Sequence, residues 1–140
     1  MSVSSSVLIK WQPGYSINIS SIDTQHQYLV KVIRQLQEAM LEGRAREVID
    51  RVFDEMNTYT KFHFQFEEEM LEKHGYPDLV GHHARHAELI DQLQQLAQQH
   101  ADGKLSAGTP VMHFLRNWLL DHIGECDKAY AAYLKGKGVS

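Results

Sequence analysis

The stretch of residues 62–86, FHFQFEEEMLEKHGYPDLVGHHARH, constrains the fold more than any other part of the chain. It contains two pairs of side chains of the kind that bind metals, His63 with Glu67 and His82 with His86. Within each pair the residues are four positions apart, so both lie on one face of an α-helix. A Gly-Tyr-Pro segment between the pairs interrupts helical structure. The stretch therefore predicts two helices joined by a tight turn, each presenting two donors of a metal site.

The first predicted helix begins near Ser20. Ser20 followed by Asp23 resembles a capping box, with aspartate in place of glutamate. An apolar stripe at helical spacing runs from Leu29 to Leu41, and His26 lies on the same face one turn earlier. Gly43 is expected to end this helix.

Three further amphipathic segments follow the first helix. The second helix is predicted from about Arg46 to Lys73, and the third runs from the Gly-Tyr-Pro break to a loop at residues 103–108. The fourth begins with Thr109 as N-cap and Pro110 as the first helical residue. Four amphipathic helices with short loops predict an all-α protein, an antiparallel up-down-up-down four-helix bundle over residues 20–134.

Residues 1–19 are predicted to form an extended arm that packs across the bundle, and residues 135–140 a short tail. A chain of 140 residues suits one domain, so residues 1–140 are expected to form a single unit. No partner strand for the arm is visible elsewhere. The apolar residues of the arm that alternate loosely with polar ones are Trp11, Tyr15, Ile17 and Ile19.

Composition excludes several classes of function. The formal net charge is −4 and there is no basic block, which argues against nucleic-acid binding. No apolar run approaches the roughly 20 residues of a membrane span, and the N-terminus lacks the pattern of a secretory signal. The single cysteine, Cys126, rules out an internal disulfide and is compatible with a reducing cytoplasm, where we expect the protein to reside. The unusual feature is the number of histidines, which is nine.

Five of these histidines and one glutamate fall on the inward stripes of the four predicted helices. A single histidine on an apolar face is more often an ordinary core residue than a metal ligand. Several of them at similar depth with a carboxylate would bury many unmet polar atoms in one layer, unless a metal binds there. The candidate ligands are His26, His63, Glu67, His82, His86 and His122.

At this point the sequence resembles the hemerythrins, and the bacterial hemerythrins in particular. The resemblance extends from the Trp11 arm to Tyr130. The matching elements are IDTQH at 22–26, HFQFEEEM at 63–70, GYP at 75–77, H-x-x-x-H at 82–86 and WLLDHIGECDKAY at 118–130.

The resemblance implies a non-haem centre of two iron ions joined by a bridging oxo or hydroxo group. One iron would be bound by His82, His86 and His122, and the other by His26 and His63. Two carboxylates, Glu67 and Asp127, would bridge them. With roughly six ligands at each iron, the His26/His63 iron keeps one position open, and in the family that position takes dioxygen.

Two assignments remain open from the residues alone. Asp127 lies five residues after His122, about 140° around an ideal helix, whereas Glu125 and Cys126 lie closer to the His122 face. A π-type bulge or another helix distortion would bring Asp127 inward. On the third helix, His83 competes with His82. The spacing from His63 favours His82.

The resemblance also implies an apolar pocket around the open position. Such a pocket offers a bound ligand no external proton and keeps water from the iron. Plain core packing explains the same side chains equally well, and both roles can hold together. The pocket residues are Phe64, Trp118, Leu119 and Ile123. The histidines left over, expected at the solvent or the rim, are His74, His83, His100 and His113.

The function implied is reversible dioxygen binding for storage, transport or delivery, without enzymatic activity. The alternatives are an oxygen or redox sensor that acts through a partner, and a di-iron peroxidase or nitric oxide reductase. Ferritin-like di-iron enzymes use mostly carboxylates with Glu-x-x-His pairs, which argues against oxygen activation here. We expect a monomer, with a protein partner that receives oxygen as a possibility.

Overall fold

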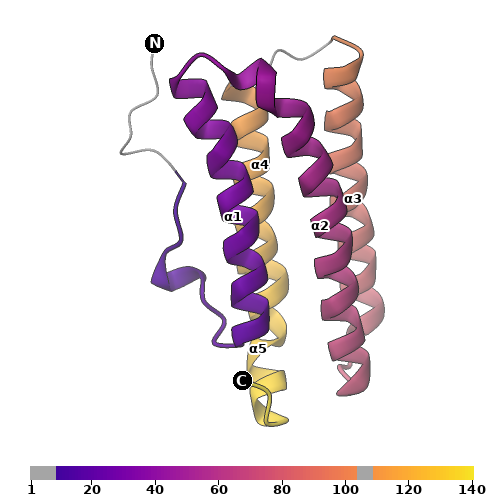
Figure 1. The fold of residues 1–140 in the computed structure, drawn as a ribbon. Coiled ribbons are helices and arrows are strands. Elements are labelled where there is room, and N and C mark those ends of the chain that lie inside the picture. Colours follow the sequence, from indigo (N-terminus) through magenta and orange to yellow (C-terminus); the bar gives the residue numbers. More distant parts are fainter. Residues whose placement is uncertain (1–8, 104–108) are drawn as a thin grey trace.

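Four long helical rods build the molecule, because each amphipathic segment has one apolar stripe to bury. The computed structural model describes residues 9–103 and 109–140, except for the side chains of residues 109, 110 and 125–127. Consecutive rods run in opposite directions, and no strand occurs among those residues (Figure 1). The predicted all-α, antiparallel four-helix bundle is confirmed. The helices are α1 (Ser20–Leu41), α2 (Ala45–Lys73), α3 (Leu79–Ala101), α4 (Thr109–Asp121) and α5 (Lys128–Gly136). The first three rods are α1, α2 and α3, and the fourth rod consists of α4, residues 122–127 and α5.

The turns between the helices use glycine where the backbone becomes left-handed. Gly43 follows α1 with φ 72°, and Gly75 follows α2 with φ 67°. Side chains with a Cβ atom rarely adopt this conformation, so glycine ends both helices at little energetic cost. Gly75 is also the first residue of the predicted Gly-Tyr-Pro break. The side chain of Thr109, the predicted N-cap of the fourth helix, lies outside the described residues.

The fourth rod is not a regular α-helix throughout. Between α4 and α5 the backbone forms a π-helical segment, η3 (His122–Asp127). A π-turn closes on the fifth residue instead of the fourth, so it adds one residue to the turn. Position 127 therefore follows position 122 at a smaller angle around the axis than in an ideal α-helix. This is the kind of distortion that the sequence requires if Asp127 is to share the His122 face.

The start of α1 corrects the capping-box prediction. The N-cap residue is Ile19 and makes no side-chain cap hydrogen bond, and Ser20 is already helical and exposed. The Asp23 carboxylate instead reaches back to the arm. It accepts hydrogen bonds from Ser16 Oγ at 2.5 Å and from the backbone N–H of Ile17 at 2.9 Å. The prediction was wrong because Asp23 secures the preceding segment rather than the first helical turn.

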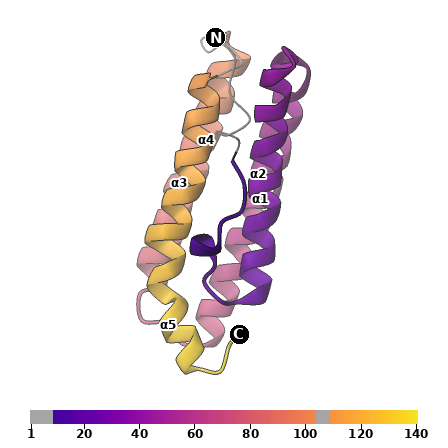
Figure 2. The same ribbon diagram turned by 90° about the vertical axis from the view of Figure 1, so that its left-hand side faces the viewer.

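The described part of the arm lies along the seam between α1 and the fourth rod (Figure 2). Its beginning is held by the backbone N–H of Ile9, which donates to Gln37 Oε1 on α1. Its middle is a short 3-10 turn, Pro13–Tyr15, and the carbonyl of Gly14 within this turn accepts a hydrogen bond from Lys128 Nζ at 2.8 Å. The arm is thus fixed at both the first and the fourth rod. Residues 1–8 of the predicted arm lie outside the described residues.

The interior consists of two hydrophobic clusters. The larger cluster includes Leu29, Phe64 and Ile123. The smaller one, near the C-terminal end of the chain, consists of Ile17, Ile19, Ile22, Leu71, Tyr130 and Leu134. On the first, second and fourth rods the candidate metal donors fall in the sequence between members of these two groups. On α3 they fall between Leu79, which packs against the smaller cluster, and Leu93 of the larger one. The donors therefore form a polar layer with apolar packing on both sides.

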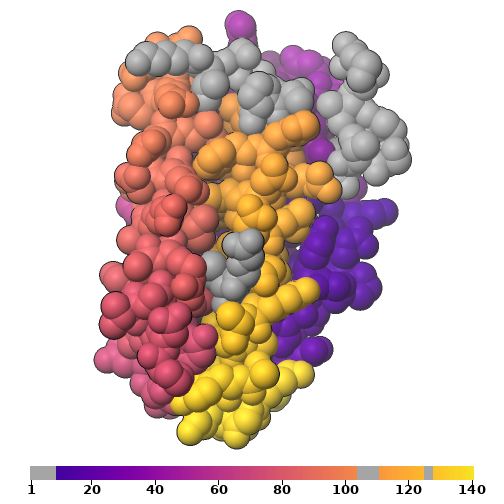
Figure 3. All heavy atoms as spheres, turned by 180° about the vertical axis from the view of Figure 1, so that it is seen from behind, coloured from indigo at the N-terminus to yellow at the C-terminus, as the bar shows by residue number. Residues whose placement is uncertain are grey.

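Seen from behind, α3 and α4 form one broad face of the molecule, with α5 at its lower end (Figure 3).

No helix in the described ranges combines the length and the apolar character needed to cross a bilayer.

The α2–α3 turn generates a stability prediction. Tyr133 Oη lies 2.7 Å from the carbonyl oxygen of His74 and 2.9 Å from that of Gly75, so α5 holds this turn in place. We expect Tyr133→Phe to lower the free energy of unfolding by about 1 kcal/mol, since a hydroxyl donor is lost. Urea denaturation should show a lower midpoint at an unchanged slope. Tyr15→Phe is the matched control, because the Tyr15 hydroxyl makes no hydrogen bond to a described residue. Equal midpoints for the two variants would contradict the role of Tyr133.

Candidate metal centre

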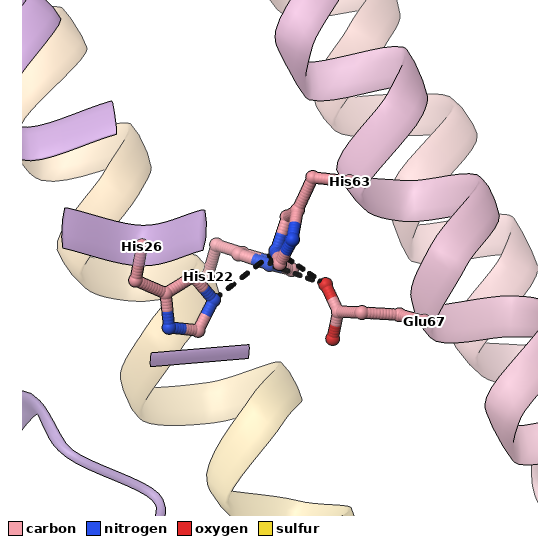
Figure 4. A group of neighbouring side chains, drawn as sticks. All are labelled: His26, His63, Glu67 and His122. Atoms are coloured by element: carbon pink, nitrogen blue, oxygen red, sulfur yellow. Dashed lines mark hydrogen bonds and ion pairs between the residues drawn. The ribbon is translucent and has the colours of Figure 1, made fainter. Parts of the chain in front are cut away.

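The structure brings the six candidate donors that it describes into one layer. α1 supplies one of them, α2 two, α3 two, and the beginning of the π-helical segment the last. Four of the six converge from three rods in Figure 4. None is more than 1% exposed to solvent: His26, His63, Glu67, His82, His86 and His122.

The donors divide into two groups that share one carboxylate. In the first group, one ligand atom from each of His26, His63, Glu67 and His122 lies within 4.8 Å of all the others. The second group, with the same spacing, joins Glu67 to His82 and His86. Glu67 therefore stands where a carboxylate would bridge two metal ions.

His122 stands between the two groups. Its Nε2 lies 3.2 Å from His63 Nε2 and 3.1 Å from Glu67 Oε1, which places it in the first group by distance. Its ring centroid is also 5.3 Å from that of His86. The family pattern assigns His122 to the His82/His86 metal, and that assignment remains a prediction.

The chemistry of the first group suits a metal ion. The Nε2 atoms of His26 and His63 are 3.1 Å apart, and His63 Nε2 lies 2.6 Å from Glu67 Oε1. Each neutral imidazole has one N–H donor and one nitrogen lone pair, and an ionised carboxylate has lone pairs only. Where several imidazole nitrogens face one carboxylate oxygen, there are therefore more lone pairs than protons to bind them. Imidazole nitrogen combined with carboxylate oxygen is a donor set that iron, zinc and copper accept.

Two further residues orient the histidines from outside. Gln25 Oε1 lies 2.6 Å from His63 Nδ1, and Glu68 Oε2 lies 2.8 Å from His86 Nδ1. When Nδ1 carries the proton and donates it in this way, Nε2 keeps its lone pair for a metal. Neither residue was predicted from the sequence. The only signal for them was adjacency, since Gln25 precedes His26 and Glu68 follows Glu67.

His86 gives the clearest sign that a ligand belongs in this layer. Its Nε2 is buried and has no hydrogen-bond partner among the described residues, and Glu67 Oε1 lies 3.9 Å from it. Burial lowers the pKa of His86 to about 4, which outweighs the opposite effects of the Glu67 charge and the Glu68 hydrogen bond. His86 is therefore neutral at pH 7, with a free lone pair directed at the layer.

Glu68 is ionised and directed away from the layer. Burial raises the pKa of its carboxyl, but hydrogen bonds with His83 and His86 outweigh that effect and hold the pKa below its ordinary value. Its Oε1 bonds to His83 Nδ1, whose imidazole is 68% exposed. His83 therefore lies outside both donor groups, as expected of a rim residue.

The Glu67 carboxylate is fixed by a phenol. The buried Tyr130 hydroxyl donates to Glu67 Oε2, while Glu67 Oε1 faces His63 and His122. The two oxygens of one carboxylate thus have different neighbours. This arrangement sets the orientation of Glu67 within the layer.

Of the predicted pocket residues, Phe64 packs directly against the donors. Phe64 stacks on His86 with ring centroids 3.8 Å apart, and its ring centroid is 4.8 Å from that of His122. The ring centroids of Trp118 and Phe64 are 6.2 Å apart, and the Trp118 Nε1–H donates to the carbonyl of Leu89 at 3.0 Å. All four predicted residues belong to the larger hydrophobic cluster: Phe64, Trp118, Leu119 and Ile123.

Three further histidines belong to neither donor group. His74 Nδ1 lies 2.8 Å from the carbonyl oxygen of Met70, and His100 Nε2 lies 3.1 Å from Asp50 Oδ1. His113 is exposed. The side chain of Asp127 lies outside the described residues, so only its backbone position in the π-helical segment is placed.

Comparisons with known proteins agree with the geometry. A family model described as the hemerythrin HHE cation binding domain matches residues 18–134. A bacteriohemerythrin of Stenotrophomonas maltophilia (strain R551-3) is 34% identical over 131 residues, which cover 91% of this chain and 82% of that protein. A myohemerythrin of Riftia pachyptila is 25% identical over 124 residues, covering 89% and 92% of the two chains. The crystal structure of a wild-type hemerythrin superimposes with a TM-score of 0.79 at 28% identity, over 90% of this chain and 97% of that one.

The family match spans the arm junction, all four rods and every candidate donor. Together with the similarity to the Stenotrophomonas protein over most of both chains, it identifies the chain as a member of the hemerythrin family.

Proposed function

We propose that this protein binds dioxygen reversibly at a non-haem di-iron centre and does not turn over a substrate. The observation that carries the proposal is the pair of buried donor groups that share Glu67. Membership of the hemerythrin family and the similarity to bacteriohemerythrins support iron and dioxygen as the ligands. The proposed iron ligands are His26, His63, Glu67, His82, His86, His122 and Asp127.

An odd number of histidines makes the proposed centre asymmetric. Whichever metal takes His122, one metal would bind three imidazoles and the other two. With two shared carboxylates and one solvent-derived oxo or hydroxo ligand, the metal with two imidazoles would be one ligand short of roughly six. The iron pair, when bound, supplies the two electrons and the open position that dioxygen requires.

The protein's own contribution is to exclude water and protons from that position. Phe64, Leu119 and Ile123 are buried and carry no titratable group. Trp118 has the one polar hydrogen among the four pocket residues, and the Leu89 carbonyl accepts it. A bound ligand therefore meets no side-chain proton donor from these four residues. Such surroundings favour release of the ligand unchanged over its reduction.

The donor set favours binding over catalysis. The two described donor groups contain five histidines and one carboxylate, whereas ferritin-like di-iron enzymes use mostly carboxylates. A sensor that acts through a partner and a di-iron peroxidase or nitric oxide reductase are the competing functions. We also propose a cytoplasmic location, with which the single cysteine is compatible. We further propose a monomer, with a protein partner that receives oxygen as a further possibility.

The first test is an optical titration of the reduced, iron-loaded protein with dioxygen. We expect a visible absorption band that appears with dioxygen, disappears on degassing and returns over repeated cycles. Irreversible bleaching with rapid consumption of peroxide or nitric oxide would favour the enzymatic alternative and contradict the proposal.

Glu67→Gln tests whether one carboxylate serves both metals. Because Glu67 belongs to both donor groups, we expect the variant to lose both irons rather than one, as measured by iron content per chain. Glu69→Gln is the matched control, since Glu69 is exposed on the same helix and bonds only to Gln65 among the described residues. A variant that keeps one full equivalent of iron would show that Glu67 is not shared.

Asp127→Ala and Glu125→Ala separate the two carboxylates that follow His122. The π-helical backbone favours position 127, so we expect Asp127→Ala to lower iron content and to abolish the dioxygen-dependent band. Glu125→Ala should leave both unchanged. The reverse pattern would assign the second bridge to Glu125.

A further inference from the structure

The two sides of the centre differ in the charge of the group that bonds to Nδ1 of one histidine on each side. On the His82/His86 side, His86 Nδ1 bonds to the Glu68 carboxylate at 2.8 Å. On the His26/His63 side, His63 Nδ1 bonds to the neutral amide oxygen of Gln25 at 2.6 Å. The hydrogen-bond geometry is comparable, so the main difference between the two supports is one negative charge.

We propose that Glu68 is a positioning residue that makes the His82/His86 side the tighter of two metal sites, while Gln25 leaves the His26/His63 side the weaker one. This inference rests on the proposed di-metal function. It goes beyond it by assigning an order in which the two positions fill and empty.

A carboxylate partner strengthens a histidine ligand in two ways. It fixes the proton on Nδ1, so Nε2 is the atom that binds, and it raises the basicity of that Nε2. The amide of Gln25 fixes the proton on His63 equally well, but without a charge it raises basicity less, because hydrogen bonds to ionised acceptors are roughly twice as strong as neutral ones.

Glu68 is held where it can act on His86. Its second oxygen bonds to His83 Nδ1, so both oxygens are engaged by residues one turn apart on α3. Its side chain is only 23% exposed, which limits screening by water. The carboxylate therefore links α2 to α3 behind the metal layer.

The His86 ring has little freedom apart from the position of its proton. It stacks on Phe64 with an interplanar angle of 5° and centroids 3.8 Å apart. Its Nε2 lies 3.9 Å from Glu67 Oε1. Because packing fixes the ring and Glu68 fixes the proton, the metal-facing lone pair of His86 is preorganised before any metal binds.

Anaerobic titration of the metal-free full chain with Co²⁺ tests the inference, with d–d absorption as the readout. We expect the wild-type chain to bind two Co²⁺ with separable affinities. Glu68→Gln should weaken the tighter site by about tenfold, at the lower end of the range for outer partners of histidine ligands, and leave the weaker site unchanged. Gln25→Glu should tighten the weaker site. Glu69→Gln, which removes the same charge one residue away, should change neither.

The second readout is the tautomer of His86 in the metal-free chain, measured by ¹⁵N NMR of the imidazoles. We expect an Nδ1-protonated ring in the wild type and a mixture of tautomers in Glu68→Ala. Two results would overturn this inference without affecting the proposed function. One is wild-type affinity at both sites in Glu68→Gln and in Gln25→Glu, and the other is equal weakening of both sites in Glu68→Gln. Fewer than two Co²⁺ bound by the wild type would overturn the proposed di-metal function as well.

Discussion

The structure depends on how one buried carboxylate is accommodated. The Glu67 side chain has no solvent exposure, and removing an ion of this size from water carries an effective penalty of several kcal/mol even after relaxation. Among the described residues, the Tyr130 hydroxyl offsets part of that penalty, because it donates a hydrogen bond to Glu67 Oε2. Divalent ions on either side of Glu67 would offset it more completely. Charge balance at this residue is therefore a physical reason to propose a metal centre at this level of the bundle.

The bundle supplies the rigid frame that such a site needs. Apolar clusters lie on both sides of the donor layer, so donors on four rods keep their positions through packing rather than through flexible loops. The arm adds to this frame by joining the first and fourth rods at Gln37 and Lys128. The π-helical segment is the one irregular stretch of the fourth rod, and it coincides with the last two proposed ligands. Local distortion of a helix is a common way to direct one extra side chain into a functional site.

Much of the fold and of the donor layer could be predicted from the sequence, because both rest on helical periodicity. The i, i+4 pairs of α2 and α3 specify a shared face whatever the packing, and glycine marks the ends of α1 and α2. The capping-box prediction failed because short motifs do not reveal which tertiary partner a polar side chain prefers, and Asp23 bonds to the arm. Gln25 and Glu68 were missed for a similar reason. Their role depends on contacts with rings 38 and 18 residues away, which periodicity does not encode.

We propose that two iron ions share Glu67 inside this layer. A crystal structure of the iron-loaded protein, with anomalous diffraction collected on both sides of the iron absorption edge, tests it directly. We predict two iron peaks about 3.5–4 Å apart, as in other two-metal sites, with Glu67 bound to both and the five histidines divided three to two. A single peak, or two peaks that do not share Glu67, would contradict the account.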